Sequence, residues 1–206
     1  MCIRDSRRPD PSGRHEFSGI DKQPQSFIDV AAPGPHYGDG SGVRGDIIGD
    51  TQHHGGNDKA IYAYAREELD YWQSELSRPL ASGCFGENLT TQGVDLSALL
   101  INQRLRIGTA VLEVSVPRQP CSTFAGWLGE RGWLKRWTAR GDCGTYLRII
   151  SPGRIQPGDC ITMDAPPNHD ITMRIAFAAK MGNRTLAQRV IEAGCLPPHQ
   201  NNSLRA

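Results

Sequence analysis

The longest regular hydrophobic pattern in the chain lies between residues 60 and 76. Apolar residues recur there at helical spacing, at positions 61, 64, 65, 69, 72 and 76. Arg66, Glu67 and Asp70 fall on the other face. The pattern predicts an amphipathic helix over Ala60–Leu76, which Pro79 would end.

Shorter stretches show the alternation of apolar and polar residues that is typical of strands. They cover residues 26–30, 110–116, 145–150 and 160–163. Gly158-Asp159 lies between the last two, and such a turn often ends a hairpin. Short strands punctuated by Gly and Pro favour a mainly β, folded-over barrel over a parallel sheet.

The composition changes after Pro166-Pro167. Residues 171–178 and 186–193 read as two short helices capped by Asp170 and Thr185, and a third short element is expected from Pro197 onward. We therefore expect a domain boundary near residue 165, with a β domain over 17–165 and a helical extension over 166–206. So small a unit needs to dock on the barrel or on a second subunit.

The first sixteen residues differ from the rest of the chain. They are rich in Arg, Asp, Ser and Pro and nearly devoid of apolar residues, so we expect residues 1–16 to be disordered. Met1–Ser6 look foreign to the remainder, and we expect that they arose from assembly of the reading frame, which resequencing of the source DNA would test.

Composition limits the classes of partner. A chain of 206 residues suits one core, and 23 Lys and Arg against 22 Asp and Glu leave a net charge of +1, which gives no reason to expect nucleic acid or an anionic membrane. No stretch has the length of a membrane span or the character of a secretory signal, so we expect a cytoplasmic protein. Its six cysteines lack zinc-type spacing and are expected to be free thiols.

One candidate site is the segment His53-His54-Gly55-Gly56-Asn57-Asp58-Lys59, directly before the predicted helix. Two glycines at a helix N-terminus would expose backbone N–H groups, and Lys59 adds a full positive charge, so an anion such as a phosphate could bind. An ordinary glycine-rich helix start capped by Asp58 fits the segment equally well.

The second candidate is Pro117-Arg118-Gln119-Pro120-Cys121. The prolines stiffen the backbone around Arg118, which suits bidentate contact with phosphate or carboxylate and would favour the reactive thiolate of Cys121. The alternative is that Cys121 is simply a small buried hydrophobe. That description fits Cys160, Cys84 and Cys195 better.

Three further features are ambiguous. Glu87 and Asn88 could bind polar edges of a ligand or could satisfy an Asx-type turn. Cys143 could lie near Cys121, although an incidental surface thiol is favoured. The tryptophans at positions 127, 133 and 137 could cover a flat substrate, but a packed face is favoured.

Several of these motifs, taken in order, carry a resemblance. They are Gly45-Asp46, residues 54–60 (His-Gly-Gly-Asn-Asp-Lys-Ala), residues 85–89 (Phe-Gly-Glu-Asn-Leu), residues 106–108 (Arg-Ile-Gly), residues 117–121 (Pro-Arg-Gln-Pro-Cys), residues 144–148 (Gly-Thr-Tyr-Leu-Arg) and Gly158-Asp159. Over residues 17–165 the chain resembles the MOSC domain, most closely its YiiM-like branch. Residues 168–205 are similar to the three-helix extension that often follows the domain in that branch.

The resemblance implies a MOSC-type β-barrel that binds the molybdenum cofactor, a pterin with a terminal phosphate and a dithiolene; pyridoxal phosphate is not expected. It implies that Cys121 is the sulfur ligand to molybdenum. Arg118, Lys59 and His54, with Gly55 and Gly56, would hold the cofactor. Asn88 and Glu87 would lie on the substrate side.

The same resemblance implies an activity. Members of the branch are similar to reductases of N-hydroxylated bases and related compounds, which take electrons from a separate flavoprotein. A sulfur or cofactor carrier with a Cys121 persulfide is the alternative, and an interaction module without cofactor is a third. The helical tail is compatible with a homodimer. The sequence departs from the family pattern in the glycine-rich segment 34–42 and at Cys143.

Overall fold

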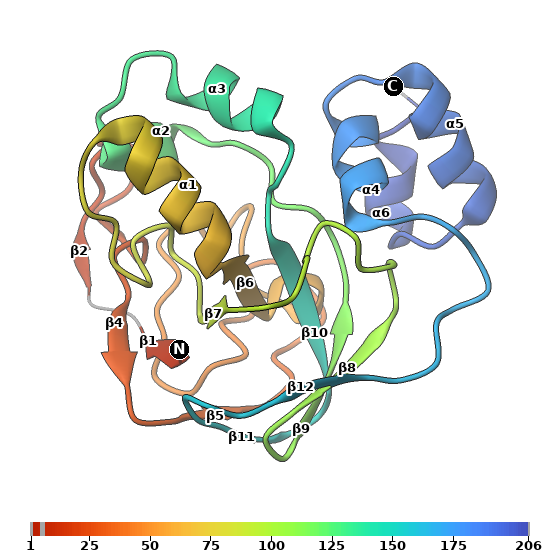
Figure 1. Cartoon of the computed structure of the whole chain (residues 1–206), viewed down its shortest axis with the longest axis horizontal. Helices are drawn as coiled ribbons and strands as arrows, with labels where there is room; N and C mark the ends of the chain where they lie inside the picture. The colour runs from red at the N-terminus through yellow and green to blue at the C-terminus, as the bar shows by residue number, and fades with distance from the viewer. Residues whose placement is uncertain (1, 5–6, 206) are drawn as a thin grey trace.

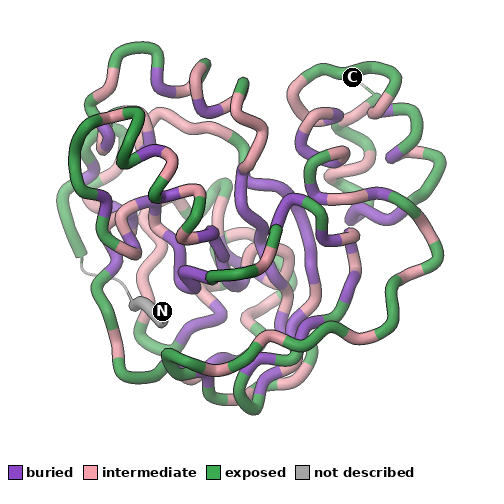
Figure 2. Tube along the Cα trace, in the orientation of Figure 1, coloured by how far each residue is buried: buried purple, intermediate pink, exposed green. Residues whose placement is uncertain are grey.

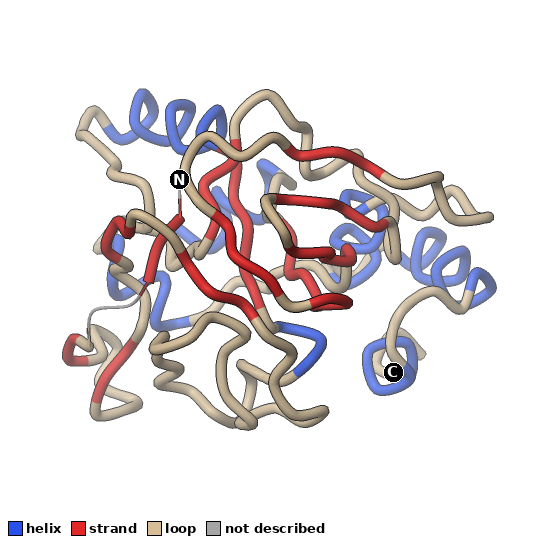
Figure 3. The backbone as a smooth tube through the Cα atoms, turned by 90° about the horizontal axis from the view of Figure 1, so that it is seen from below, coloured by secondary structure: helices blue, strands red, loops and turns tan. Residues whose placement is uncertain are grey.

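A curled sheet of eight strands forms the centre of the molecule (Figures 1 and 3). The computed structural model describes residues 2–4 and 7–205. Across the sheet the order is β12 (Ile161–Met163), β8 (Arg104–Ile107), β9 (Ala110–Val114), β10 (Thr145–Ser151), β6 (Ile61–Ala65), β7 (Leu89–Thr91), β1 (Cys2–Arg4) and β4 (Gln23–Gln25). Neighbouring strands are antiparallel except β6 and β7, which are parallel.

Two small sheets complete the β structure. One pairs β11 (Gly153–Ile155) with β5 (Ile28–Val30), and the other pairs β2 (Arg8–Pro9) with β3 (Phe17–Ser18). The prediction of a mainly β, barrel-like fold followed by C-terminal helices is confirmed (Figure 1).

The segment predicted as one helix over Ala60–Leu76 is a strand followed by a helix. All five residues of β6 are buried, and α1 (Arg66–Leu76) begins only after the extended residue Ala65. The reason is tertiary, because β6 lies between β10 and β7 and needs no polar face. Figure 2 shows this buried centre of the sheet.

The strands predicted at residues 145–150 and 160–163 exist, but they do not pair with each other. β10 pairs with β6 and β9, whereas β12 pairs with β8. Between them β11 leaves the sheet to pair with β5, and the amide of Thr109 donates to the carbonyl of Arg154 at 3.0 Å. The Gly-Asp turn therefore does not close a two-stranded hairpin.

Two short helices between β9 and β10 in the chain carry part of an aromatic cluster. They are α2 (Ser122–Leu128) and α3 (Trp133–Arg140). The Trp133 ring meets Trp72 of α1 at 4.6 Å, Phe124 at 5.3 Å and Phe85 at 5.6 Å, each edge to face. Trp133 and Trp137 are 1% and 0% exposed. They form a packed face, as favoured from the sequence, and not a lid.

The C-terminal extension contains three helices, as predicted: α4 (Met173–Lys180), α5 (Arg184–Ala193) and α6 (Pro198–Asn202). The predicted caps are wrong. Thr172, and not Asp170, accepts the amide of Ile175 at 3.2 Å; Asn183, and not Thr185, accepts the amide of Leu186 at 3.1 Å. Several polar residues precede each helix, and only the backbone geometry selects the cap among them.

The extension docks on the β domain. The amide of Ile101 donates to the carbonyl of Ile171 at 3.0 Å, and the Trp137 and Phe177 rings meet edge to face at 5.6 Å. This contact buries the apolar side that the short helices could not bury alone. The domain boundary at residue 165 stays a prediction.

The described part of residues 1–16 forms polar turns and a strand pair, and the prediction that the segment is disordered stays a prediction. Asp10 accepts the amides of Ser12 and His15, both at 3.0 Å, and β2 pairs with β3. Polar turns and backbone pairing, not apolar burial, hold this segment. Residues 1, 5 and 6 lie outside the described residues, and the origin of Met1–Ser6 stays a prediction. In the described part of the chain no helix combines the length and apolarity that crossing a bilayer requires.

The aromatic cluster predicts a large stability effect. Trp133→Ala should lower the free energy of unfolding by about 3–5 kcal/mol, because it leaves a cavity among three rings. Urea denaturation followed by circular dichroism measures this. Met163→Ala, at a side chain that is 48% exposed, is the control and should cost less than about 1 kcal/mol. Equal costs for the two variants would contradict the assignment of the cluster as core.

Candidate cofactor-binding pocket

A pocket opens beside the central strands of the sheet. It has an empty volume of about 730 Å³ with the space at its mouth included, within the range usual for small-molecule sites. Its lining includes the following residues singled out in the sequence: His54, Gly55, Lys59, Asn88, Arg118 and Cys121. Segments far apart in the chain therefore meet at one place, as the candidate site required.

Cys121 is presented where the strand-like chain turns into α2. The backbone still runs along β10 at Val116, whose carbonyl accepts the amide of Tyr146 at 3.0 Å. Cys121 itself is extended, with φ −138° and ψ 161°, and its carbonyl accepts the amide of Ala125 at 3.1 Å. Its free thiol is half-buried and faces the pocket. It therefore differs from an inert core cysteine in being reachable by a ligand.

Arg118 forms the inner wall of the pocket. It is 6% exposed, donates a hydrogen bond to the carbonyl of Phe85, and lies over the rings of Tyr62 at 4.7 Å and Phe124 at 4.3 Å. Burial opposes its charge, but the net shift raises its pKa, so it stays a cation. Among residues 2–4 and 7–205 no carboxylate forms an ion pair with it. A buried cation in this situation favours an anionic ligand.

Lys59 supplies a second cation. Its Nζ donates to the carbonyl of His53 at 2.7 Å and lies 4.6 Å from the centre of the Tyr37 ring and 5.5 Å from that of Tyr146. Burial lowers its pKa to about 8. Most molecules therefore carry the charge at neutral pH.

His54 is the neutral member of the group. Its Nδ1 lies 3.2 Å from the Tyr146 hydroxyl. Burial, followed by the charges of Lys59 and Arg118, lowers its pKa to about 3. An uncharged imidazole beside two cations can accept or donate a hydrogen bond without adding repulsion.

The predicted anion cradle at a helix N-terminus is wrong. Only the single 3₁₀ turn η1 (Asn57–Lys59) follows the glycines, and β6 comes next. The amide of Gly56 donates to the carbonyl of Gly40, and that of Asn57 to Gly34, both at 2.9 Å. Those N–H groups therefore hold the segment 34–42 and are not offered to a ligand.

Gly56 is required for backbone reasons. Its φ is 72°, and a Cβ there would lie 2.1 Å from the carbonyl oxygen of His36. Asp58 does not cap the turn, because its carboxylate pairs with Arg148 at 2.6 Å. The glycine-rich segment that looked foreign to the family pattern is thus the support of the pocket wall.

The two residues predicted near the substrate separate. Asn88 lines the pocket, where its Nδ2 donates to Asp46 at 2.9 Å and its Oδ1 accepts the amide of Tyr62 at 3.1 Å. Glu87 is 0% exposed, and its carboxylate accepts from Gly83 at 2.6 Å, Phe85 at 3.1 Å and Thr90 at 3.0 Å. Glu87 shapes its own loop and does not line the pocket.

Sequence reasoning missed the aromatic and acidic part of the lining. Tyr62 was assigned to a helix, and nothing marked Tyr146 beyond its place in a motif. Lys22 pairs with Asp46 at 2.6 Å, and the motif Gly45-Asp46 was the one signal for this pair. Their pairing depends on long-range folding that spacing along the chain does not encode.

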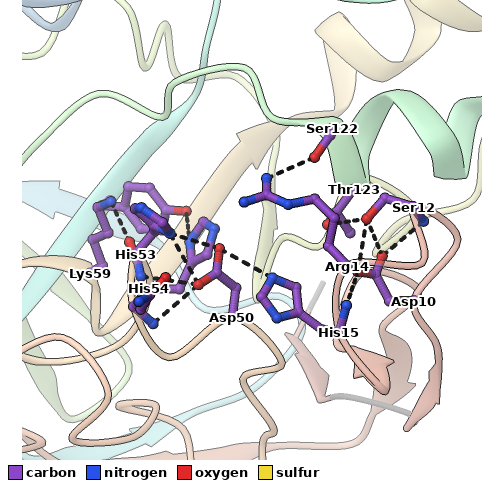
Figure 4. A network of polar contacts seen from close by, with 12 residues as sticks. Asp10, Ser12, Arg14, His15, Asp50, His53, His54, Lys59, Ser122 and Thr123 are labelled. Atoms are coloured by element: carbon purple, nitrogen blue, oxygen red, sulfur yellow. Dashed lines mark hydrogen bonds and ion pairs between the residues drawn. The ribbon is translucent and has the colours of Figure 1, made fainter.

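The N-terminal segment contributes Asp10 and His15 to the pocket lining, and both belong to the polar network of Figure 4. Arg14 donates to the Ser122 hydroxyl at 3.0 Å, next to Cys121 in the chain. His15 points toward Asp50, with Nε2 and Oδ2 3.6 Å apart, and Asp50 lies 3.0 Å from Nδ1 of His53. Burial would raise the pKa of Asp50, but the hydrogen bond with His53 and the neighbouring histidines lower it overall.

The remaining cysteines are only partly as expected. Cys143 is buried and not on the surface; burial raises its pKa to about 12, which keeps the thiol protonated. Cys195 is buried and Cys84 half-buried. Cys160 was expected to be buried but is exposed, and it lies directly before the edge strand β12.

Fold and pocket together define a β-barrel-like protein with a thiol and two cations around one cavity. Comparison with known proteins identifies the family. The model of the MOSC domain matches residues 50–162, and the chain is 40% identical over 155 residues to the uncharacterized protein YflK of Bacillus subtilis, covering 74% of this chain and 70% of YflK. The chain belongs to the MOSC domain family.

The YiiM-like branch is supported in sequence and in fold. The chain is 31% identical over 117 residues to YiiM of Escherichia coli, which covers 55% of this chain and 52% of YiiM. The crystal structure of YiiM from Geobacillus stearothermophilus superposes with a TM-score of 0.75 over 99% of this chain and 95% of that one, at 24% identity.

A fungal relative matches over a smaller share of its length. A protein of Gibberella moniliformis named reductase is 31% identical over 135 residues, which is 63% of this chain and 24% of the reductase. The chain thus spans about half of the YiiM sequence and a quarter of the fungal one.

The His-Gly-Gly turn yields a prediction with a matched control. Gly129→Ala is the control: it introduces only the strain of a positive φ, since no atom lies within 4 Å of the added Cβ. It should lower the free energy of unfolding by about 1–2 kcal/mol. Gly56→Ala adds a backbone clash and should cost about 1–3 kcal/mol more. Urea denaturation of both variants measures the difference, and similar values would show that segment 34–42 does not confine Gly56.

The pKa of His54 predicts a pH effect on stability. The pKa of His54 is about 3 in the folded state and 6.5 in the unfolded chain. Between pH 6.5 and 3 the unfolded chain therefore binds a proton that the folded state does not, so the free energy of unfolding falls as pH drops below 6.5. His54→Asn should flatten the curve of unfolding free energy between pH 6.5 and 4. His36→Asn, on the exposed loop, is the control. An unchanged slope in His54→Asn would refute the assignment.

Proposed function

We propose that this chain binds the molybdenum cofactor in the pocket and reduces N-hydroxylated bases and related compounds, with Cys121 as the metal ligand. The observation that carries the proposal is the presence of a reachable thiol and a buried cation without a carboxylate partner, within the described residues, in one lining. A terminal phosphate would complement that cation, and a soft metal would complement the thiolate.

The residues fit the group in kind. Arg118 and Lys59 would hold the phosphate end, and Cys121 the metal end. Gly55 belongs to the lining, and a Cβ there would lie 2.7 Å from the carbonyl oxygen of Gly40. Asn88 lies in the same wall with its side-chain amide, whereas Glu87 does not line the pocket and is not proposed to contact the ligand. When bound, the cofactor supplies two-electron redox chemistry through its metal.

The chain's own residues would prepare the reduction. Conversion of an N–OH group to N–H with release of water consumes two electrons and two protons. With a pKa of about 8, Lys59 Nζ is protonated at neutral pH and would hold the phosphate end as a cation beside Arg118. His54, uncharged, can orient a polar group of the substrate beside Tyr146.

The relatives support the class of activity. Family membership and the fungal protein named reductase favour an oxidoreductase. The proposal includes a separate flavoprotein as electron donor, a cytoplasmic setting that keeps Cys121 reduced, and compatibility with a homodimer. The rival is a sulfur carrier, in which Cys121 bears a persulfide and no turnover follows.

The test is the molybdenum and phosphorus content of protein purified from cells that make the cofactor. Near-stoichiometric molybdenum is expected in the parent. Cys121→Ser should fold normally but lose the metal and the reduction of N-hydroxylated compounds, because a hydroxyl is a poor ligand for a soft metal. Cys160→Ser, at an exposed thiol outside the pocket, is the matched control and should behave as the parent.

The outcomes separate the two functions. Absence of both elements from the parent would contradict cofactor binding. The carrier function would be favoured by two results together. The parent would contain the metal but would not reduce N-hydroxylated compounds when a chemical reductant is supplied, and it would carry a sulfane sulfur that Cys121→Ser lacks. Full activity in Cys121→Ser would refute the role of Cys121.

A further inference from the structure

The helical extension reaches the wall of the pocket through Tyr37. Tyr37 lies in the glycine-rich segment 34–42 and is half-buried. Its hydroxyl accepts a hydrogen bond from Nε2 of Gln200 at 2.7 Å and lies 2.8 Å from Nε2 of His199, both on α6. The Tyr37 and His199 rings also meet edge to face, with centres 5.3 Å apart. Three contacts therefore fix one tyrosine to the extension.

The face of the same ring meets a pocket cation. Lys59 Nζ lies 4.6 Å from the centre of the Tyr37 ring, within the range of cation–π attraction. Lys59 lines the pocket, whereas Tyr37 stands behind it and is not part of the lining. The ring thus limits how far the ammonium group can retreat from the cavity.

α6 is itself held in place. Lys180 at the end of α4 donates from Nζ to the carbonyl of Gln200 at 2.7 Å. A helix of five residues would be unstable alone, so its orientation depends on such contacts. The contacts run from α4 through α6 and Tyr37 to Lys59.

We propose that Tyr37 is a positioning residue for Lys59, and that α6 holds Tyr37, so that the helical extension helps to form the anion-binding end of the pocket. The proposal deepens the proposed function and rests on it only where Lys59 is taken to contact an anion. It assigns a role to two parts of the chain that the β domain alone does not explain: segment 34–42 and the extension.

Three variants test the geometry. Tyr37→Phe keeps the ring and loses its hydroxyl; Tyr37→Ala loses both; His199→Ala combined with Gln200→Ala loosens the tether from the α6 side. Tyr71→Ala is the matched control, since it removes a ring that lies 4.0 Å from the Arg140 guanidinium outside the pocket.

Two readouts are used on the full chain. The first is the pH dependence of Lys59 acylation by acetic anhydride, followed by peptide mass spectrometry. The second is the affinity for inorganic pyrophosphate, measured by calorimetry. Among the charged or titratable groups that act on Lys59 are Asp50, Lys180, Cys121 and Asp58, and all variants retain them. His54 and His199 also interact with Lys59, and of these the α6 double variant removes His199.

Tyr37→Ala is expected to shift the midpoint of Lys59 acylation from about 8 toward 10.5, because burial is the main cause of the low pKa. Pyrophosphate binding should weaken about tenfold. The α6 double variant should move both readouts in the same direction by less, Tyr37→Phe should move them least, and Tyr71→Ala should leave them unchanged.

Parent-like acylation in both Tyr37→Ala and the α6 variant would overturn the proposal. If Tyr37→Ala does not fold, the α6 variant and Tyr37→Phe decide the test, and parent-like acylation in both would overturn the proposal. A protein that shows the expected acylation shifts but no molybdenum would sustain the positioning role and overturn only the proposed function.

Discussion

The rest of the pocket depends on how the charge of Arg118 is accommodated inside the protein. Its guanidinium has a carbonyl, that of Phe85, and two aromatic faces, those of Tyr62 and Phe124, but no carboxylate among the described residues. Transfer of a charge from water into the interior is costly unless it is paired. These partners come from a loop, from β6 and from α2. The buried charge of Arg118 is therefore stabilised only when all three segments are correctly placed around it. A bound anion would supply the compensation that the protein leaves open.

The aromatic layer above the sheet follows from the same requirement. The Arg118 guanidinium lies over the Phe124 ring, and the same ring meets Trp133 edge to face. The Phe85 ring meets both Phe124 and Trp133 edge to face. The pocket wall and the helical layer are therefore one packed unit. Rigid packing of this kind holds a functional side chain more precisely than a loop can.

Sequence reasoning succeeded where local pattern and final structure agree. The alternation at residues 110–114 is the burial pattern of β9, and the motifs around His54, Lys59, Arg118 and Cys121 do meet. It failed at β6, because five consecutive buried residues look alike in a helix and in a central strand. It failed for Glu87 because an acidic residue in a loop has the same signature whether it binds a ligand or its own backbone. Tyr62 and Tyr37 carried no signal in the sequence, and Tyr146 carried none beyond its place in a motif. The role of a tyrosine depends on neighbours that the sequence alone does not identify.

The electrostatics of the pocket are compatible with the proposed anionic ligand even though the net charge of the chain is only +1. Arg118 and Lys59 are positive and His54 is neutral. The three acids in the lining have other partners: Asp10 accepts the amides of Ser12 and His15, Asp46 contacts Lys22, Ser41 and Asn88, and Asp50 contacts His53 and backbone amides. Among the described residues these acids form no ion pair with Arg118 or Lys59, so the two cations are left for a ligand. Because low polarity strengthens fields over short distances, two cations there suffice without a basic surface. The proposed anion site would therefore depend on the fold's interior and not on overall composition.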